Sequence, residues 1–201
     1  MSSVLNRKKK KMQPLGYKEE IHVFNQKKVR KMNYATEIAS KTFLDTKLIS
    51  YQILHDKFGF GLKRIKRLEA EINALLDGET SCSEMVCYLS KEKGIDLTNI
   101  DVPQRELLGF QGVSYDNCIL PLQNKINVIA GTVSDYIVLS VTALRTLFKF
   151  SKNQIMKYVE WICYYIGSIS MGYETMTGVA SVLECECKYI DERFIGKTYE
   201  V

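Results

Sequence analysis

Proline is scarce in this chain, and so are the residue patterns that mark several common classes of protein. Only three of the 201 residues are proline, at positions 14, 103 and 121, so long stretches are free to be helical. The alternation of apolar and polar residues that marks half-buried strands is almost absent. Apolar residues instead recur with helical spacing and are interrupted by short breaks, which predicts an all-α fold.

Metal-binding spacings are also missing, although the chain contains six cysteines. There is no CxxC pair, and Cys185 and Cys187 are separated by one residue on a predicted helix, where alternate positions diverge. The two histidines, His22 and His55, fit no zinc spacing. We therefore expect reduced, mostly buried thiols in a cytosol, with no metal and no cofactor.

Signatures of membrane insertion and of common enzymes are lacking as well. The N-terminus is a lysine run without an apolar stretch after it, the apolar run 159–172 is too short to span a bilayer, and Asp135 interrupts the other candidate. No GxxxxGK, GxGxxG, HExxH or GxSxG motif occurs. His55 and Asp56 are adjacent, but neighbouring residues on a helix point in different directions, so we expect a surface histidine rather than an acid–base pair. These absences favour a cytoplasmic protein that is not an enzyme and not bound to a membrane.

Positive charge is concentrated at the N-terminus. Residues 1–34 carry ten basic and two acidic side chains, a net charge of +8, whereas the remainder has a net charge of −3. A basic arm on a mildly acidic body is typical of contact with a polyanion. Lys8, Lys9, Lys10 and Lys11 are the candidate nucleic-acid-binding residues of this arm. The alternative is a solubilising tail with little fixed structure.

Two segments of the chain resemble each other when they are offset by ninety positions. Seven of the twenty-eight positions from 45 to 72 are identical in the two segments, where ordinary composition would give about two. The identical pairs are Asp45/Asp135, Ser50/Ser140, Leu54/Leu144, Phe58/Phe148, Phe60/Phe150, Ile65/Ile155 and Ile72/Ile162. This pattern predicts the tandem duplication of a three-helix unit.

The two predicted units follow one plan of helices and breaks. Apolar periodicity and glycine stops place the helices at about 34–58, 62–76, 81–93, 124–148, 152–167 and 172–188. The first helix is expected to be capped by Asn33, and residues 17–33 are compatible with either a short helix or a strand. The predicted divisions are a basic arm, a first repeat, a linker with at most a short strand or turn, and a second, degenerate repeat, over 1–33, 34–100, 101–123 and 124–195.

The break between the first two predicted helices has a composition suited to phosphate binding. The segment 58–68 reads FGFGLKRIKRL and resembles the second half of a helix–hairpin–helix DNA-binding element, in which an apolar residue lies between two glycines. Free amides at a helix start favour an anion, and glycines allow close approach of the backbone. The candidate nucleic-acid-binding residues here are Gly59, Gly61, Lys63, Arg64 and Arg67, with Lys66 pointing further round the helix.

This segment departs from the helix–hairpin–helix pattern in two ways. The preceding helix is longer than in that family, and Phe58 stands where a proline is often found. The alternative interpretation is a tight turn whose glycines only reverse the chain and whose basic residues only face solvent. In the second unit both glycines are replaced, by Lys149 and Ser151, so any binding is expected to belong to the first unit, with the second supporting it structurally.

The second unit carries an aromatic helix instead of a basic one. Its aromatic residues are Tyr158, Trp161, Tyr164 and Tyr165. Such a helix is typical of a core or of a homodimer interface, and an exposed stacking platform is the alternative.

A wider resemblance covers about residues 35–97. The motif HDKFGFGLKR at 55–64, followed by an apolar helix and an acidic helix that ends near Gly94, resembles small uncharacterised proteins encoded by phages and prophages of Gram-positive bacteria. The resemblance implies an accessory protein in the cytoplasm of the bacterial host, and it implies no particular activity.

Two functional hypotheses follow from the sequence. The first is a non-enzymatic protein that binds nucleic acid, DNA rather than RNA, through the basic arm and the glycine-containing turn. The second is a protein-binding module that inhibits a host defence or a host enzyme, for which the net charge of −3 on the body could mimic a polyanion. An enzyme is a third hypothesis with no motif in its favour.

Overall fold

The computed structural model describes residues 17–98, 100, 102–113 and 119–195. Within these ranges the chain forms seven α-helices, one short 3₁₀ helix and no strand, which confirms the all-α prediction. The helices are α1 (Tyr17–Phe58), α2 (Leu62–Leu76), α3 (Cys82–Lys93), α4 (Gln104–Gln111), α5 (Leu122–Phe148), α6 (Lys152–Ser170), α7 (Met176–Cys187) and the 3₁₀ helix η1 (Glu192–Phe194).

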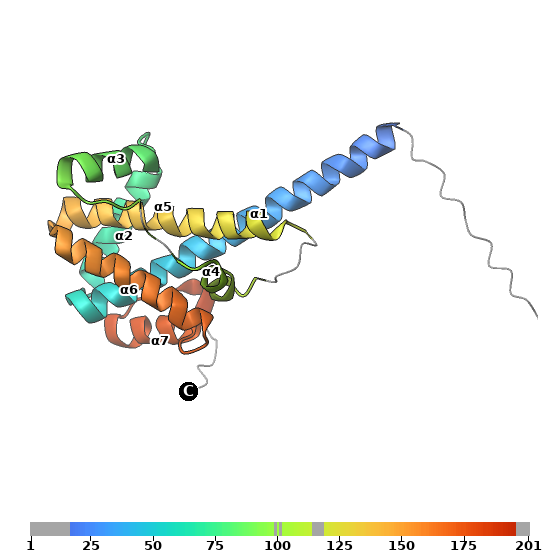
Figure 1. Ribbon diagram of the computed structural model, residues 1–201. Coiled ribbons are helices and arrows are strands. Elements are labelled where there is room, and N and C mark those ends of the chain that lie inside the picture. The colour runs from blue at the N-terminus through green and yellow to red at the C-terminus, as the bar shows by residue number, and fades with distance from the viewer. Residues whose placement is uncertain (1–16, 99, 101, 114–118, 196–201) are drawn as a thin grey trace, which may run out of the picture.

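Helix α1 is much longer than the sequence pattern predicted. It continues through Asn33, which was expected to cap its start, and settles the open assignment of residues 17–33 as helix. The 42 residues of α1 contain neither glycine nor proline, and an asparagine inside a helix costs only a fraction of a kcal/mol. The N-terminal part of α1 projects away from the rest of the molecule (Figure 1), and residues 25–33 are exposed.

Helix α4 lies inside the segment that was predicted to be a linker. It begins after Pro103 and ends at Gly112, which adopts a left-handed conformation with φ of 60°. A Cβ atom on Gly109 would lie 2.1 Å from Oγ of Ser170, so only glycine allows α4 to pack this closely on α6. Leu107, Leu108 and Phe110 of α4 are buried in the core.

The two long helices form the centre of the molecule, and the shorter helices that follow each of them in the chain pack on the other. Helices α1 and α5 contact each other, α2 and α3 pack on α5, and α6 and α7 pack on α1. All residues from Leu48 to Leu54 on α1 are buried, as are Val138–Val141, Ala143 and Leu144 on α5. The two stretches lie ninety positions apart. Their apolar residues are not confined to one face of the helix, because neighbouring helices cover each stretch on all sides.

The ends of corresponding helices share their geometry. Helix α1 ends in Gly59 with φ of 66°, and α5 ends in Lys149 with φ of 56°. Helices α3 and α7 likewise end in left-handed residues, Gly94 and Lys188. Helix α6 has 19 residues where α2 has 15, so the two halves differ in length before their last helices.

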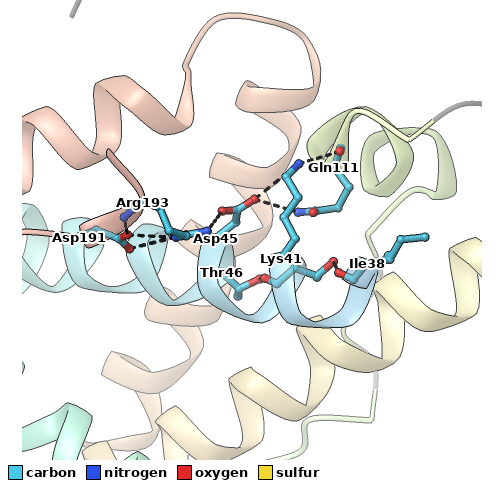
Figure 2. A network of polar contacts seen from close by, with 8 residues as sticks. Ile38, Lys41, Asp45, Thr46, Gln111, Asp191 and Arg193 are labelled. Atoms are coloured by element: carbon cyan, nitrogen blue, oxygen red, sulfur yellow. Dashed lines mark hydrogen bonds and ion pairs between the residues drawn. The ribbon is translucent and has the colours of Figure 1, made fainter. Parts of the chain in front are cut away.

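A buried carboxylate joins α1, α4 and the C-terminal segment. Asp45 on α1 is only 2% exposed and accepts a hydrogen bond of 2.6 Å from Nη1 of Arg193. Nε2 of Gln111 on α4 lies 3.4 Å from the same carboxylate, and Nζ of Lys41 lies 3.9 Å away. Asp191 binds the other side of the Arg193 guanidinium, as Figure 2 shows. The network therefore fixes the C-terminal segment against the middle of α1.

Helix α5 meets the length and composition of a membrane-spanning helix. Of its most apolar stretch, 61% is buried inside the molecule, and core helices of water-soluble proteins satisfy the same criteria. Among the described residues, α5 is the one helix that does so.

Candidate nucleic-acid interface

The turn between α1 and α2 is exposed and open. Gly59 takes a left-handed conformation, with φ of 66°, and its amide donates to the carbonyl of His55. Gly61 is extended, with φ of −90° and ψ of 175°, so it does not need glycine for its backbone conformation, contrary to the expectation that both glycines reverse the chain. Both are exposed, and a Cβ atom on either would meet nothing within 4 Å.

The start of α2 has no side-chain cap, whereas the start of α6 has a complete one. Gly61 offers no side chain to the first-turn amides of α2, and no acidic residue lies in that turn. At the corresponding position of α6, Ser151 accepts from the amide of Gln154, and the Gln154 side chain accepts from the amide of Ser151. The positive end of the α2 dipole is therefore open to an anion, while that of α6 is already satisfied.

Three basic side chains surround a groove beside this turn. Lys63, Arg64 and Arg67 are all exposed and line one hollow of about 550 Å³. The guanidinium carbon of Arg64 lies 5.6 Å from the centre of the Phe60 ring, and that of Arg67 lies 5.8 Å from the Phe148 ring. Lys66 instead lines a hollow on another side of α2, as its place on the helix predicted.

The floor of the groove consists of four phenylalanines, two from each turn. The ring of Phe60 lies 4.8 Å from Phe148 and 5.9 Å from Phe150, and Phe58 lies 5.1 Å from Phe150. The groove therefore spans the two halves of the chain, with Gln154 of α6 lining it as well. Sequence reasoning assigned no binding role to Phe148, Phe150 or Gln154. The signal that could have found the two aromatic residues was their identity with Phe58 and Phe60.

His55 connects the α1–α2 turn to helix α7. Its Nδ1 lies 2.9 Å from the carbonyl oxygen of Phe60, and its Nε2 lies 2.9 Å from a carboxylate oxygen of Glu186 on α7. The hydrogen bond to the Phe60 carbonyl and the contact with Glu186 raise the pKa of His55 above its usual value, against the opposing effect of burial. At the corresponding position of the second turn, Arg145 donates to the carbonyl of Phe150. A side-chain nitrogen thus contacts a backbone carbonyl oxygen at each turn.

The structure changes the interpretation of His55 and Asp56. We expected a surface histidine that points away from Asp56, but His55 is half-buried, and ligand atoms of His55, Asp56 and Glu186 lie within 4.8 Å of one another. These three residues are the group in the described part of the chain that could hold a metal ion. The Nδ1 atom of His55 contacts the Phe60 carbonyl oxygen and its Nε2 atom contacts Glu186, and the two carboxylates are exposed.

The predicted basic arm and the turn lie at opposite ends of α1. Lys8, Lys9, Lys10 and Lys11 fall outside the described residues. Four basic residues of the arm, at 27, 28, 30 and 31, are exposed on the projecting part of α1. From Lys31 to Phe58 the helix advances about 40 Å, at about 1.5 Å per residue. The structure thus gathers Gly59, Gly61, Lys63, Arg64 and Arg67 at one surface and leaves the arm at another.

Comparisons of the chain with protein-family models, with curated proteins and with solved structures each gave no match. The geometry and chemistry of the groove and the arm therefore provide the evidence for function.

Proposed function

We propose that this protein is a non-enzymatic nucleic-acid-binding protein, with the groove beside the α1–α2 turn as its principal contact. The observation that carries the proposal is the combination of three exposed cations, Lys63, Arg64 and Arg67, with the open start of α2 at a single groove. Cations at this spacing suit the successive phosphates of a polymer backbone, and such contacts carry little sequence preference. DNA remains the favoured polymer.

The arm on α1 supplies a second contact in this proposal. The arm and the groove lie about 40 Å apart along α1, which corresponds to about 12 base pairs of duplex at about 3.4 Å each. A polymer of that length or longer reaches both surfaces at once, so the two weak contacts reinforce each other.

A salt titration of binding tests the proposal. Affinity for a labelled DNA is measured at several salt concentrations for the wild type, for the triple variant Lys63→Ala/Arg64→Ala/Arg67→Ala, and for the control Lys66→Ala on another side of α2. If each of the three cations releases about one counterion, the slope of log affinity against log salt becomes shallower by about 2 to 3 in the triple variant. The control variant Lys66→Ala should change this slope by no more than about 1. Absence of binding to DNA and RNA at low salt would end the proposal.

A protein-binding function is the second candidate, and an exposed aromatic patch on α6 and the following turn favours it. Tyr164, Met171 and Tyr173 are 64%, 62% and 79% exposed and surround a hollow of about 310 Å³. Large apolar side chains gathered at a surface are typical of protein interfaces. A stoichiometric protein partner that survives nuclease treatment and is lost in Tyr164→Ala would favour this function over nucleic-acid binding.

We also propose that the two halves arose by duplication of a three-helix unit. The reciprocal packing of α2 and α3 on α5 and of α6 and α7 on α1 supports this origin, as do the paired left-handed ends at Gly59 and Lys149. On this proposal the first turn kept an open anion-binding helix start, and the second turn acquired a side-chain cap.

A further inference from the structure

The four phenylalanines of the groove are more than phosphate binding requires. Lys63, Arg64 and Arg67 together with the open amides of α2 are sufficient to contact a backbone. Beneath them, Phe60 and Phe150 are buried, at 2% and 5% exposure. Phe58 and Phe148 are only partly buried, so apolar ring surface remains in contact with solvent inside a groove that is rimmed by cations.

The exposed ring surface matches the chemistry of an unpaired base. A groove of about 550 Å³ is large enough for a nucleobase, and stacking of a base on an aromatic side chain contributes about 1 to 3 kcal/mol. In a duplex both faces of each base are already stacked, so the rings could not be used. The guanidinium groups of Arg64 and Arg67 lie over the rings of Phe60 and Phe148. A base that stacks on Phe148 therefore takes the ring face that Arg67 covers, and the displaced guanidinium is close enough to contact the phosphate that follows.

We propose that this groove binds single-stranded nucleic acid, with unpaired bases stacked on Phe58 and Phe148 and phosphates held by Lys63, Arg64 and Arg67. This inference rests on the proposed nucleic-acid-binding function and makes it specific to unpaired strands. The Gln154 side-chain oxygen accepts from Ser151, which leaves its amide nitrogen to donate to a base edge on the α6 side of the groove.

The second half of the chain is then part of the site and not only its support. Phe148 and Phe150 come from the end of α5, and Gln154 comes from the first turn of α6. A groove made from the first turn alone would lack half of its ring surface.

The test uses three labelled probes of equal length with the full-length protein: a single-stranded DNA of about 12 nucleotides, the corresponding duplex, and an abasic strand that keeps the phosphates without the bases. Fluorescence anisotropy gives the three affinities at one salt concentration. We expect the single strand to bind at least about 5-fold more tightly than the abasic strand, because stacking of even one base contributes that much, and more tightly than the duplex. This comparison needs no variant.

Substitutions then locate the effect. Phe58→Leu/Phe148→Leu keeps apolar volume but removes the aromatic faces, and we expect it to abolish the preference for the single strand over the abasic strand. Phe43→Leu is the matched control, because Phe43 is partly buried and packs edge-on against Tyr136 at 5.1 Å, away from the groove. Circular dichroism confirms that each variant is folded.

The possible failures are distinguishable. Equal affinity for all three probes, with the salt dependence intact, overturns the single-strand inference and leaves the proposed function in place. A preference that survives Phe58→Leu/Phe148→Leu also overturns it, since the bases would then be bound elsewhere. Absence of binding to every probe overturns the proposed function itself.

Discussion

Replacing Arg193 by alanine should destabilise the protein by about 3 kcal/mol. The carboxylate of Asp45 is 2% exposed and would lose its shortest hydrogen bond, that of 2.6 Å from Arg193. Its remaining partners are weak, because Gln111 Nε2 lies 3.4 Å away and Lys41 is 54% exposed at 3.9 Å. Asp191 would lose the same guanidinium.

The magnitude follows from the burial of the two partners. Removing one partner of a fully buried ion pair costs about 3 to 5 kcal/mol, because the other charge stays buried without compensation. The Arg193 side chain is 29% exposed, so water partly screens the pair and the lower end of that range applies. Urea unfolding at neutral pH, followed by circular dichroism, measures the difference as a shift in midpoint at constant slope.

A double-mutant cycle separates the ion pair from lost packing. Asp45→Asn removes the charge that Arg193 neutralises, so Arg193→Ala should cost at least about 1 kcal/mol less in the Asp45→Asn background. Arg30→Ala, at an exposed position on the projecting part of α1, is the control and should change stability by less than about 0.5 kcal/mol. If Arg193→Ala lowers the free energy of unfolding by no more than the control does, the predicted role of the ion pair is refuted.

Two further predictions concern the supports of the turns. Because the pKa of His55 is raised in the folded protein, its contribution to stability is complete below the unfolded value of about 6.5 and is lost as pH rises through the folded value. When the pH is raised from about 6 to about 8, the thermal midpoint of the wild type and of the control His22→Gln should therefore decrease. The decrease should be smaller in His55→Gln, and identical pH profiles for the three proteins would contradict this prediction. Lys149→Gly should raise the free energy of unfolding by about 0.5 to 1 kcal/mol, because it relieves a left-handed conformation, whereas Gly59→Ala should lower it by about 1 to 2 kcal/mol. Denaturant unfolding measures both, and a stabilising Gly59→Ala would be inconsistent with the positive φ.

The sequence predicted the elements that local signals define. Helix α2 begins and ends as expected, at Leu62 and Leu76, because Gly61 and the Asp77–Gly78 break flank an amphipathic segment. The start of α3 follows a capping box between Ser81 and Glu84. In contrast, Asn33 resembles a cap but lies inside α1, since nothing near it breaks the helix.

Elements that depend on tertiary contacts were not predictable. Helix α4 is only eight residues long, between Pro103 and Gly112, and its apolar residues Leu107, Leu108 and Phe110 are buried in the core by contacts with other helices. The candidate cations Lys63, Arg64 and Arg67 could be identified because they lie close together in the sequence, at the start of one predicted helix. The identity of Phe148 and Phe150 with Phe58 and Phe60 marked the two residues, but their meeting in one groove could not be predicted, because Phe60 and Phe148 come together only when α1 and α5 pack.

The reciprocal packing of the helices has a consequence for synthesis of the chain on the ribosome. Helix α1 is translated early, yet it is covered by α6 and α7. The hydrogen bond between Ser50 and Tyr158 joins residues 108 positions apart, and that between Glu69 and Tyr189 joins residues 120 apart. The part of the α1 surface that α6 and α7 cover therefore stays exposed until those two helices have been synthesised. Apolar surface that stays exposed during this interval is prone to aggregation, because its native contacts are distant in sequence.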